Sequence, residues 1–266
     1  MFKTRLLSGI LLVLIALVTI ISGGDVLFLT LLMISFIGMT ELYKVLEISG
    51  SLLGIAGYVA AVVYYGLLRF GKTDWITVLA IAFLIVLMAI YVFAYPKHRS
   101  EQIMLAFFGL FYVAFMLSYV YQIRMLEQGA FIVWLVFICS WGCDTCAYCV
   151  GMLLGKHKLA PKLSPKKSIE GAVGGVAGAA LLGVVYAAVI NRLAPGTDAS
   201  LLGYALICAV GGAISQVGDL AASGIKRNHD IKDYGNLIPG HGGILDRFDS
   251  VIFTAPIIYY LAVALL

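Results

Sequence analysis

Three aspartates lie inside or at the ends of long apolar runs, where acidic side chains are rare. They are Asp144, Asp219 and Asp246. An ionised carboxylate facing lipid is costly, so such side chains usually face a cavity and have a partner. On a helix, Tyr148 and Gly151 would share the face of Asp144, and the glycine would leave room beside the carboxylate. This pattern favours functional carboxylates over the alternative, a lone acid salt-bridged to a loop lysine.

The densest polar stretch of the chain combines cations, glycines and carboxylates. Its cationic side chains can donate hydrogen bonds to phosphate oxygens. They are Lys226, Arg227, Lys232 and Arg247. Glycines around His241 let backbone N–H groups approach an anion closely. Asp246 and Asp249, with Asp219 before them, are hard oxygen ligands of the kind that Mg²⁺ prefers. Together they suit a metal-bound polyphosphate. Retention by anionic lipid would explain the basic residues alone.

A shorter polar segment upstream repeats this combination. Lys166 and Lys167 precede Ser168, which is a better candidate than Ser164 to cap the apolar helix that follows. Lysines beside a helix N-terminus lie where a phosphate binds favourably. Capping explains the two serines, but it does not explain paired lysines followed by Glu170.

The composition identifies the class of protein that must position these residues. Apolar residues make up 62% of the 266-residue chain and charged residues 12%, against roughly 45–50% and 25% in soluble proteins. So few charges cannot cover a water-exposed globule. A soluble enzyme, a disordered chain and a secreted disulfide scaffold are excluded. The chain is predicted to be an all-α polytopic integral membrane protein.

Nine apolar runs are long enough to cross about 30 Å of hydrocarbon as helices. They are 6–22, 26–43, 51–68, 75–95, 103–122, 130–154, 171–190, 200–222 and 249–266. The first run has features of a signal peptide, but eight further runs favour a retained helix. About five spans in residues 1–129 form an N-terminal membrane region, and residues 130–266 form the catalytic membrane region.

The distribution of Lys and Arg between the spans predicts the orientation. With a cytoplasmic N-terminus, inside segments hold 14 basic residues, Lys3 and Arg5 among them, and outside segments hold 4. This orientation places the two longest loops, 155–170 and 223–248, on the cytoplasmic side. The site is therefore expected at the cytoplasmic edge of a membrane. The short chain and short loops favour a bacterial inner membrane, with an organelle membrane as the alternative.

Small residues in the catalytic region are predicted to serve helix packing. Glycines at GxxxG spacing follow the first loop: Gly171, Gly174, Gly175 and Gly178. They allow close helix contact, either within one bundle or across a homodimer. Cys143 and Cys146 form a CxxC pair, but no second pair accompanies it, so packing is favoured over a metal or redox site.

The chemistry-bearing residues resemble a known family. The pattern Ser223-x-x-Lys226-Arg227, Lys232-Asp233 and Pro239-x-His241-Gly242-Gly243-x-x-Asp246-Arg247-x-Asp249 spans 27 residues. It resembles the C-terminal motif of the phosphatidate cytidylyltransferases, or CDP-diacylglycerol synthases. Ser164-Pro165-x-Lys167-x-x-Glu170-Gly171 and Asp144-x-x-Ala147-Tyr148 also resemble that family, although Cys146 stands where relatives often carry glycine. The resemblance covers about the last half of the chain.

The resemblance implies that CTP and phosphatidic acid are converted to CDP-diacylglycerol and pyrophosphate in the membrane, without nucleic acid. It implies Mg²⁺ as cofactor, with a second divalent or a monovalent cation left open. The implied metal ligands are Asp219, Asp246 and Asp144. The implied catalytic residues are Asp144, Lys167, Asp219, Lys226, Arg227, His241, Asp246, Arg247 and Asp249. The implied substrate-binding residues are Tyr148, Ser164, Lys166, Glu170, Ser223, Lys232, Asp233, Gly242 and Gly243.

Three other functions share part of this sequence chemistry. An anion transporter would be expected to show internal repeats, but the polar motifs crowd the second half of the chain. A CDP-alcohol phosphotransferase would need paired aspartates after Asp144, and residues 150–169 contain no acid. A CTP-dependent lipid kinase has nearly the same sequence chemistry, and only the family motif favours cytidylyl transfer.

Overall fold

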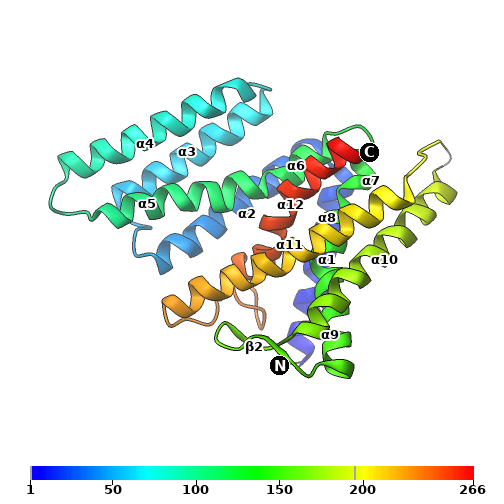
Figure 1. Cartoon of the computed structure of the whole chain (residues 1–266). Coiled ribbons are helices and arrows are strands. Elements are labelled where there is room, and N and C mark those ends of the chain that lie inside the picture. The colour runs from blue at the N-terminus through cyan, green and yellow to red at the C-terminus, as the bar shows by residue number, and fades with distance from the viewer. Residues whose placement is uncertain (1, 195) are drawn as a thin grey trace. The chain divides into compact units, whose positions relative to one another are not determined.

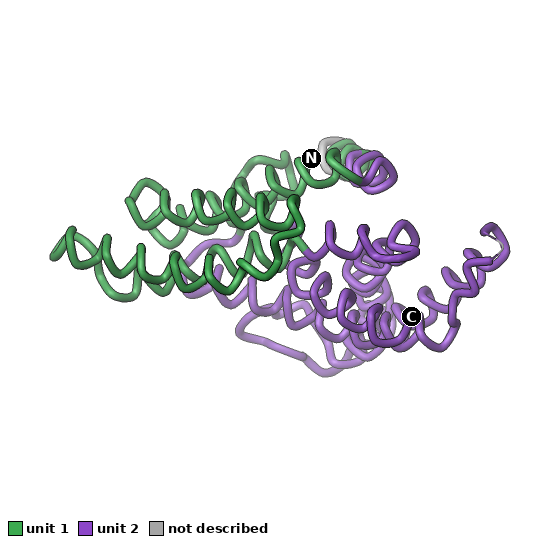
Figure 2. Tube along the Cα trace, turned by 90° about the horizontal axis from the view of Figure 1, so that it is seen from above, with its two compact units in different colours: residues 1–14, 24–118, 233–246 green, residues 15–23, 119–232, 247–266 purple. Residues whose placement is uncertain are grey.

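The computed structural model describes residues 2–194 and 196–266, with side chains from Leu7 onward. The chain forms two compact units, each built from segments distant in sequence (Figure 2). The first unit comprises residues 1–14, 24–118 and 233–246, and the second comprises 15–23, 119–232 and 247–266. Apart from one two-stranded hairpin, the regular structure of the described residues is helical, which confirms the predicted all-α class.

Eight helical segments of the described chain are long and apolar enough to cross a membrane. They are Gly24–Val45, Leu52–Arg69, Thr73–Phe93, Ser100–Arg124, Gly129–Leu154, Ile169–Leu193, Leu201–Asn228 and Leu245–Leu265. These match the second to ninth predicted runs. The first run falls on α1 (Phe2–Ser22), whose described apolar part, Leu7–Ser22, is shorter. The side chains of Lys3 and Arg5 lie outside the described part. That the first run spans the membrane, and that the N-terminus is cytoplasmic, stay predictions.

The first unit packs apolar helices through buried tyrosines. Besides the start of α1, its elements are α2 (Gly24–Val45), α3 (Leu52–Arg69), η1 (Thr73–Trp75), α4 (Ile76–Phe93), α5 (Ser100–Gly109) and η2 (Leu110–Phe115). Helix α3 lies beside α4 and α5 (Figure 1). The hydroxyl of Tyr43 donates to the carbonyl of Ala106 at 2.7 Å, so this buried polar group is satisfied where α2 meets α5.

The second unit contains the remaining helices and the hairpin. Its elements are α6 (Tyr119–Arg124), α7 (Gly129–Ile132), α8 (Trp134–Phe137), η3 (Ile138–Gly142), α9 (Cys143–Leu154), β1 (Lys158–Ala160), β2 (Ser164–Ser168), α10 (Ile169–Leu193), α11 (Leu201–Asn228) and most of α12 (Leu245–Leu265). Helix α10 packs against both α9 and α11 (Figure 1).

Small residues allow these helices to approach closely, as predicted. The buried face of α10 carries Gly171, Gly175, Ala179, Gly183 and Ala187. A Cβ atom at Gly175 would lie 2.9 Å from the Cβ of Ala147, and one at Gly183 would lie 2.7 Å from the Sγ of Cys208. The glycines of α10 and the buried cysteines therefore act in packing within the chain.

The polar segments differ from the predicted loops in two ways. Residues 155–170 include the hairpin of β1 and β2, whose strands pair antiparallel. Helix α11 runs to Asn228, so Ser223, Lys226 and Arg227 are helical rather than part of a loop beginning at 223. The helix continues because Lys226 is buried and pairs with Asp249, so the buried face of α11 extends past its apolar part.

Candidate active site

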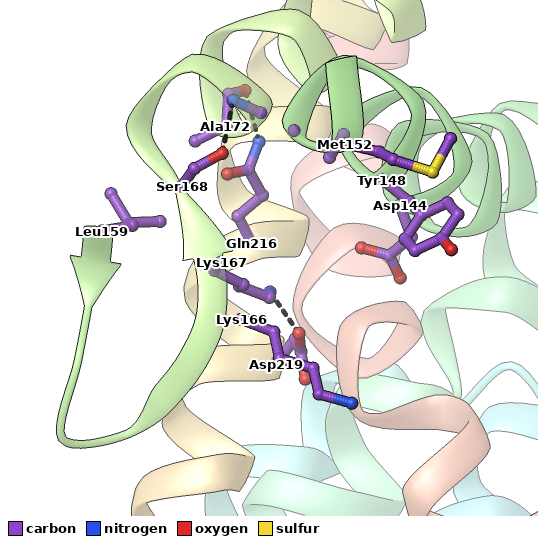
Figure 3. Close-up of a pocket in the computed structure, with 13 residues that line it drawn as sticks. Asp144, Tyr148, Met152, Leu159, Lys166, Lys167, Ser168, Ala172, Gln216 and Asp219 are labelled. Atoms are coloured by element: carbon purple, nitrogen blue, oxygen red, sulfur yellow. Dashed lines mark hydrogen bonds and ion pairs between the residues drawn. The ribbon is translucent and has the colours of Figure 1, made fainter. Parts of the chain in front are cut away.

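A pocket of about 420 Å³ in the second unit brings several predicted site residues together (Figure 3). Helix α9, the hairpin and the first turn of α10 form its walls with α11. The predicted residues that line it are Asp144, Tyr148, Lys166, Lys167 and Asp219. Segments that are separate in the sequence thus place cations and carboxylates around one cavity.

An ion pair between Lys167 and Asp219 crosses this pocket. The Nζ atom of Lys167, on β2, contacts Oδ2 of Asp219, on α11 (Figure 3). Both side chains are about one quarter exposed, at 25% and 27%, so each is only partly hydrated. Partial desolvation strengthens the attraction between these charges, so an anionic ligand must compete with Asp219 for the lysine.

The strand that carries the lysines is anchored to the start of α10. Ser168 caps this helix, as predicted, and its Oγ accepts a hydrogen bond from the N–H of Gly171 at 3.1 Å. Gly151 of α9 allows this approach, because a Cβ there would lie 3.0 Å from the Ser168 Oγ. The cap therefore fixes Lys166 and Lys167 directly before a helix N-terminus, where a phosphate is favourable.

Helix α9 places Asp144 and Tyr148 on the pocket wall, on the shared face that the sequence predicts (Figure 3). Asp144 lies within electrostatic range of Asp219 and Lys167. The carboxylates of Asp144 and Asp219 repel each other, and a cation bound between them would relieve that repulsion.

A second charged group lies farther along α11. Nζ of Lys226 is 3.9 Å from Oδ2 of Asp249, and both side chains are about nine-tenths buried. Asp249 also interacts electrostatically with Asp219 and Arg247. The Nε atom of Arg247 is buried and has no hydrogen-bond partner among the described residues. An unmatched guanidinium N–H in such a place is suited to an anionic ligand.

Glu170 joins the beginning of the hairpin to α10. Its Oε1 lies 2.6 Å from Nδ1 of His157, and its carboxylate accepts hydrogen bonds from the backbone N–H groups of Lys156 and His157. The described contacts of Glu170 are thus with the chain itself, and they restrain the segment that leads into β1.

In the first unit, Asp246 organises the polar loop of residues 233–246. Its Oδ2 accepts hydrogen bonds from the N–H groups of Tyr234 at 2.8 Å and Gly243 at 2.9 Å. Gly242 has a φ of +89°, and a Cβ there would lie 2.9 Å from the same oxygen. The predicted glycines therefore allow the backbone to fold around a carboxylate of the loop itself.

A residue that the sequence analysis missed supports the same loop. Glu41, at the end of α2, is buried, and it accepts hydrogen bonds from the N–H groups of Ile244 at 3.0 Å and Leu245 at 2.8 Å. Gly243 packs on it, because a Cβ there would lie 2.5 Å from Oε2. The signal was an acid inside the apolar run 26–43, the same signal that identified Asp144.

The other predicted residues lie outside the pocket. In the first unit, Nδ1 of His241 is 2.8 Å from Oγ of Ser8. In the second unit, a guanidinium N–H of Arg227 donates to the carbonyl of Ile231 at 3.0 Å and closes the turn after α11. The described contacts assign no ligand-binding geometry to Ser164, Ser223, Lys232 and Asp233.

The pocket carboxylates fit a magnesium ion by their chemistry. Among the described residues, no three His, Cys, Asp or Glu side chains converge on one point. Mg²⁺ is commonly held by one or two carboxylates together with waters and substrate phosphates. Asp144 and Asp219, which line one pocket and interact electrostatically, provide such a pair.

Comparisons with known proteins agree with this chemistry. A model of the cytidylyltransferase family matches residues 3–265. A phosphatidate cytidylyltransferase of Bacillus subtilis is 32% identical over 267 residues, which cover 97% of each chain. One from Staphylococcus epidermidis is 33% identical over 98% of this chain and 99% of its own length. One from Synechocystis is 44% identical over 138 residues, 52% of this chain and 45% of its own.

Proposed function

The chain belongs to the cytidylyltransferase family, and we propose that it transfers the cytidylyl group of CTP to phosphatidic acid. The products are CDP-diacylglycerol and pyrophosphate. The observation that carries this proposal is the pocket in which Lys166 and Lys167 meet Asp144 and Asp219. Cations there suit phosphates, carboxylates suit a divalent metal, and the helices that supply the carboxylates are long and apolar enough to span a membrane.

The proposed reaction forms one bond and breaks one bond at the α-phosphorus of CTP. An oxygen of the lipid phosphate attacks this atom, and the bond to the β-phosphate oxygen breaks, so pyrophosphate leaves with the bonding electrons. A phosphate monoester is already anionic, so it needs no strong general base. Catalysis then rests on alignment and charge neutralisation.

Within the pocket, Lys166 and Lys167 bind phosphate oxygens, and the exposed ring of Tyr148 on α9 contacts the lipid. Lys226 and Arg247 neutralise the remaining phosphate charge, and Asp249 orients Lys226. Glu170 and Ser168 position the hairpin. The roles of Ser164, Ser223 and Arg227 in substrate binding stay predictions from the motif.

A magnesium ion is part of the proposal, with Asp144 and Asp219 as its pocket ligands. When bound, such an ion neutralises phosphate charge and stabilises the leaving pyrophosphate. The loop with His241, Gly242, Gly243, Lys232 and Asp233 stays a predicted nucleotide-binding element. Asp246 stays a predicted metal ligand, and the amides of Tyr234 and Gly243 orient its carboxylate in the manner of supporting groups at metal sites.

The proposed location is the cytoplasmic side of a bacterial inner membrane. The excess of Lys and Arg in alternate connections, 14 against 4, supports this orientation. The substrates also support it, because CTP is soluble and the lipid phosphate lies at the headgroup level.

Labelled CTP tests the proposal directly. Detergent-purified protein is incubated with phosphatidic acid, Mg²⁺ and CTP labelled either in the cytosine ring or at the γ-phosphate. Cytidylyl transfer moves ring label into the lipid and releases γ-label as pyrophosphate. γ-label in the lipid together with CDP would instead identify a lipid kinase. If neither label moves with any divalent metal, the enzyme proposal fails and transport of an anion becomes the leading function.

A further inference from the structure

A second hollow in the second unit continues from the pocket along the seam between α10 and α11. It is an open groove with a volume of about 550 Å³. Apart from the amide of Gln216 at one end, its lining is apolar and consists mainly of small residues: Ala172, Val176, Ala180, Ala209, Ala213 and Val217. Alanines at these positions leave a groove where larger side chains would fill the seam.

We propose that this groove holds one acyl chain of the phosphatidic acid substrate. This inference rests on the proposed function and adds to it the path of the lipid tail. The groove between α10 and α11 would then select the length of the acyl chain.

The groove adjoins the pocket. Leu159, Ala172 and Gln216 line both. At this junction the Nε2 atom of Gln216 donates to the carbonyl of Ala172 at 2.9 Å, so the amide donor is already satisfied by the wall. The lining thus changes from Lys166 and Lys167 on β2 to the apolar side chains of α10 and α11, as a ligand with an anionic head and an apolar tail requires.

The dimensions and the surroundings of the groove fit a hydrocarbon chain. From Gln216 to Ala209 along α11 is about two helical turns, or about 11 Å. Val173 and Val217 at the rim are exposed, at 66% and 52%. Both helices are long and apolar enough to span a membrane, so the groove would face lipid along its length. An acyl chain anchored by its phosphate in the pocket reaches this surface without leaving the bilayer.

Narrowing the far end of the groove tests the assignment. Ala180→Leu places a larger side chain at the end remote from the lysines, and Ala188→Leu makes the same exchange at an exposed position of α10 that does not line the groove. Both variants and the unmodified protein are assayed in mixed micelles at equal mole fractions of dihexanoyl and dioleoyl phosphatidic acid. The short chains end before Ala180, so only the long-chain substrate meets the new side chain.

We expect Ala180→Leu to lower kcat/KM for the dioleoyl lipid about tenfold, the cost of excluding one to two methylene groups. Its kcat/KM for the dihexanoyl lipid should stay within about twofold of the unmodified protein, as should both values for Ala188→Leu. Two outcomes would overturn the assignment of the groove to an acyl chain while leaving cytidylyl transfer established. One is equal activity of all three proteins on both lipids, and the other is an equal loss of activity on both lipids in Ala180→Leu. Failure of the unmodified protein to act on either lipid would overturn the proposed function itself.

A second measurement does not depend on turnover. Phosphatidic acid with a photoreactive diazirine at the end of one acyl chain is irradiated with the protein, and the labelled peptides are identified by mass spectrometry. The assignment predicts labelling within 172–180 and 209–217, reduced in Ala180→Leu but not in Ala188→Leu. Labelling spread evenly over all exposed helices, or replaced by contacts with a second copy of the chain, would contradict it.

Discussion

Lys167, on the short strand β2, forms an ion pair with Asp219 on the membrane-spanning helix α11. Before a substrate enters, these two charges neutralise each other at the edge of the pocket. An incoming phosphate competes for the lysine, and the carboxylate is then available to a metal ion. The pair therefore links binding of the anionic substrate to preparation of the metal site.

Replacing Lys167 should abolish most of the activity. Lys167→Met retains the length of the side chain but removes the charge that faces the pocket. We expect kcat/KM to fall by about 10²–10³-fold, the usual loss when a donor to a developing anion is removed. Lys158→Met, on β1 of the same hairpin but outside the pocket lining, is the matched control. Similar activity of both variants would show that Lys167 does not contact substrate.

The spacing of residues was sufficient to predict the fold class and the positions of eight apolar helices. Apolar runs located eight spanning helices, and helical periodicity placed Asp144 and Tyr148 on one face. These features are predictable because they depend on local sequence. The pairing of Lys167 with Asp219 depends on packing between distant segments, so the sequence could name both residues but not their contact.

The misplaced elements have a common cause. The hairpin and the last turns of α11 are polar, and polarity alone was interpreted as loop. Their structure depends on tertiary partners, such as the carboxylate of Asp249 beside Lys226. An acid inside the apolar run 26–43 was a signal for Glu41, but its partners could not be predicted, because they are backbone N–H groups about two hundred residues later.

Glu41→Gln should weaken the loop that contains Gly242 and Gly243 of the motif. The two carboxylate oxygens of Glu41 accept hydrogen bonds from the N–H groups of Ile244 and Leu245. The glutamine amide has only one acceptor oxygen, so its NH₂ group would face one of these two backbone donors. An unsatisfied buried donor costs about 1–3 kcal/mol. We expect a lower unfolding temperature in detergent and reduced kcat/KM. Glu47→Gln, the same exchange at an exposed position, serves as control. An unchanged unfolding temperature in Glu41→Gln would refute the supporting role.

Removing the carboxylate of Glu170 should loosen the hairpin. Glu170→Ala removes the acceptor of the N–H groups of Lys156 and His157, whereas His157→Ala removes only the imidazole contact. Amide hydrogen exchange at 156–160 should therefore increase more in Glu170→Ala than in His157→Ala. Because the hairpin carries Lys167, kcat/KM should fall about tenfold in the first variant. Exchange rates and activity that match the unmodified protein in both variants would assign Glu170 no positioning role.

Because α10 packs closely against α9, one added methyl group at Gly175 should lower the stability of the protein. In Gly175→Ala the new Cβ would lie 2.9 Å from the Cβ of Ala147 and 3.0 Å from the carbonyl oxygen of Cys143, so the helices must move apart. Such overpacking costs about 1–3 kcal/mol, which thermal unfolding in detergent would report as a lower transition temperature. Gly66→Ala is the control, because a Cβ at Gly66 in α3 meets no atom within 4 Å. Equal transition temperatures would contradict the packing role of Gly175.

Metal dependence gives the most direct test of the two pocket carboxylates. Chelation should abolish activity, and added Mg²⁺ should restore it, because the proposed site relies on a divalent ion to neutralise the phosphates. Asp144→Asn retains the shape of the side chain but removes one of two carboxylate ligands, so about ten times more Mg²⁺ should be needed for half-maximal activity. Asp219→Asn also releases Lys167 from its ion pair, so it should lower maximal activity even at saturating Mg²⁺. Asp74→Asn, in η1 outside the pocket, should follow the Mg²⁺ dependence of the unmodified protein. Full activity after chelation, or a Mg²⁺ dependence that neither pocket variant changes, would exclude Asp144 and Asp219 as the metal ligands.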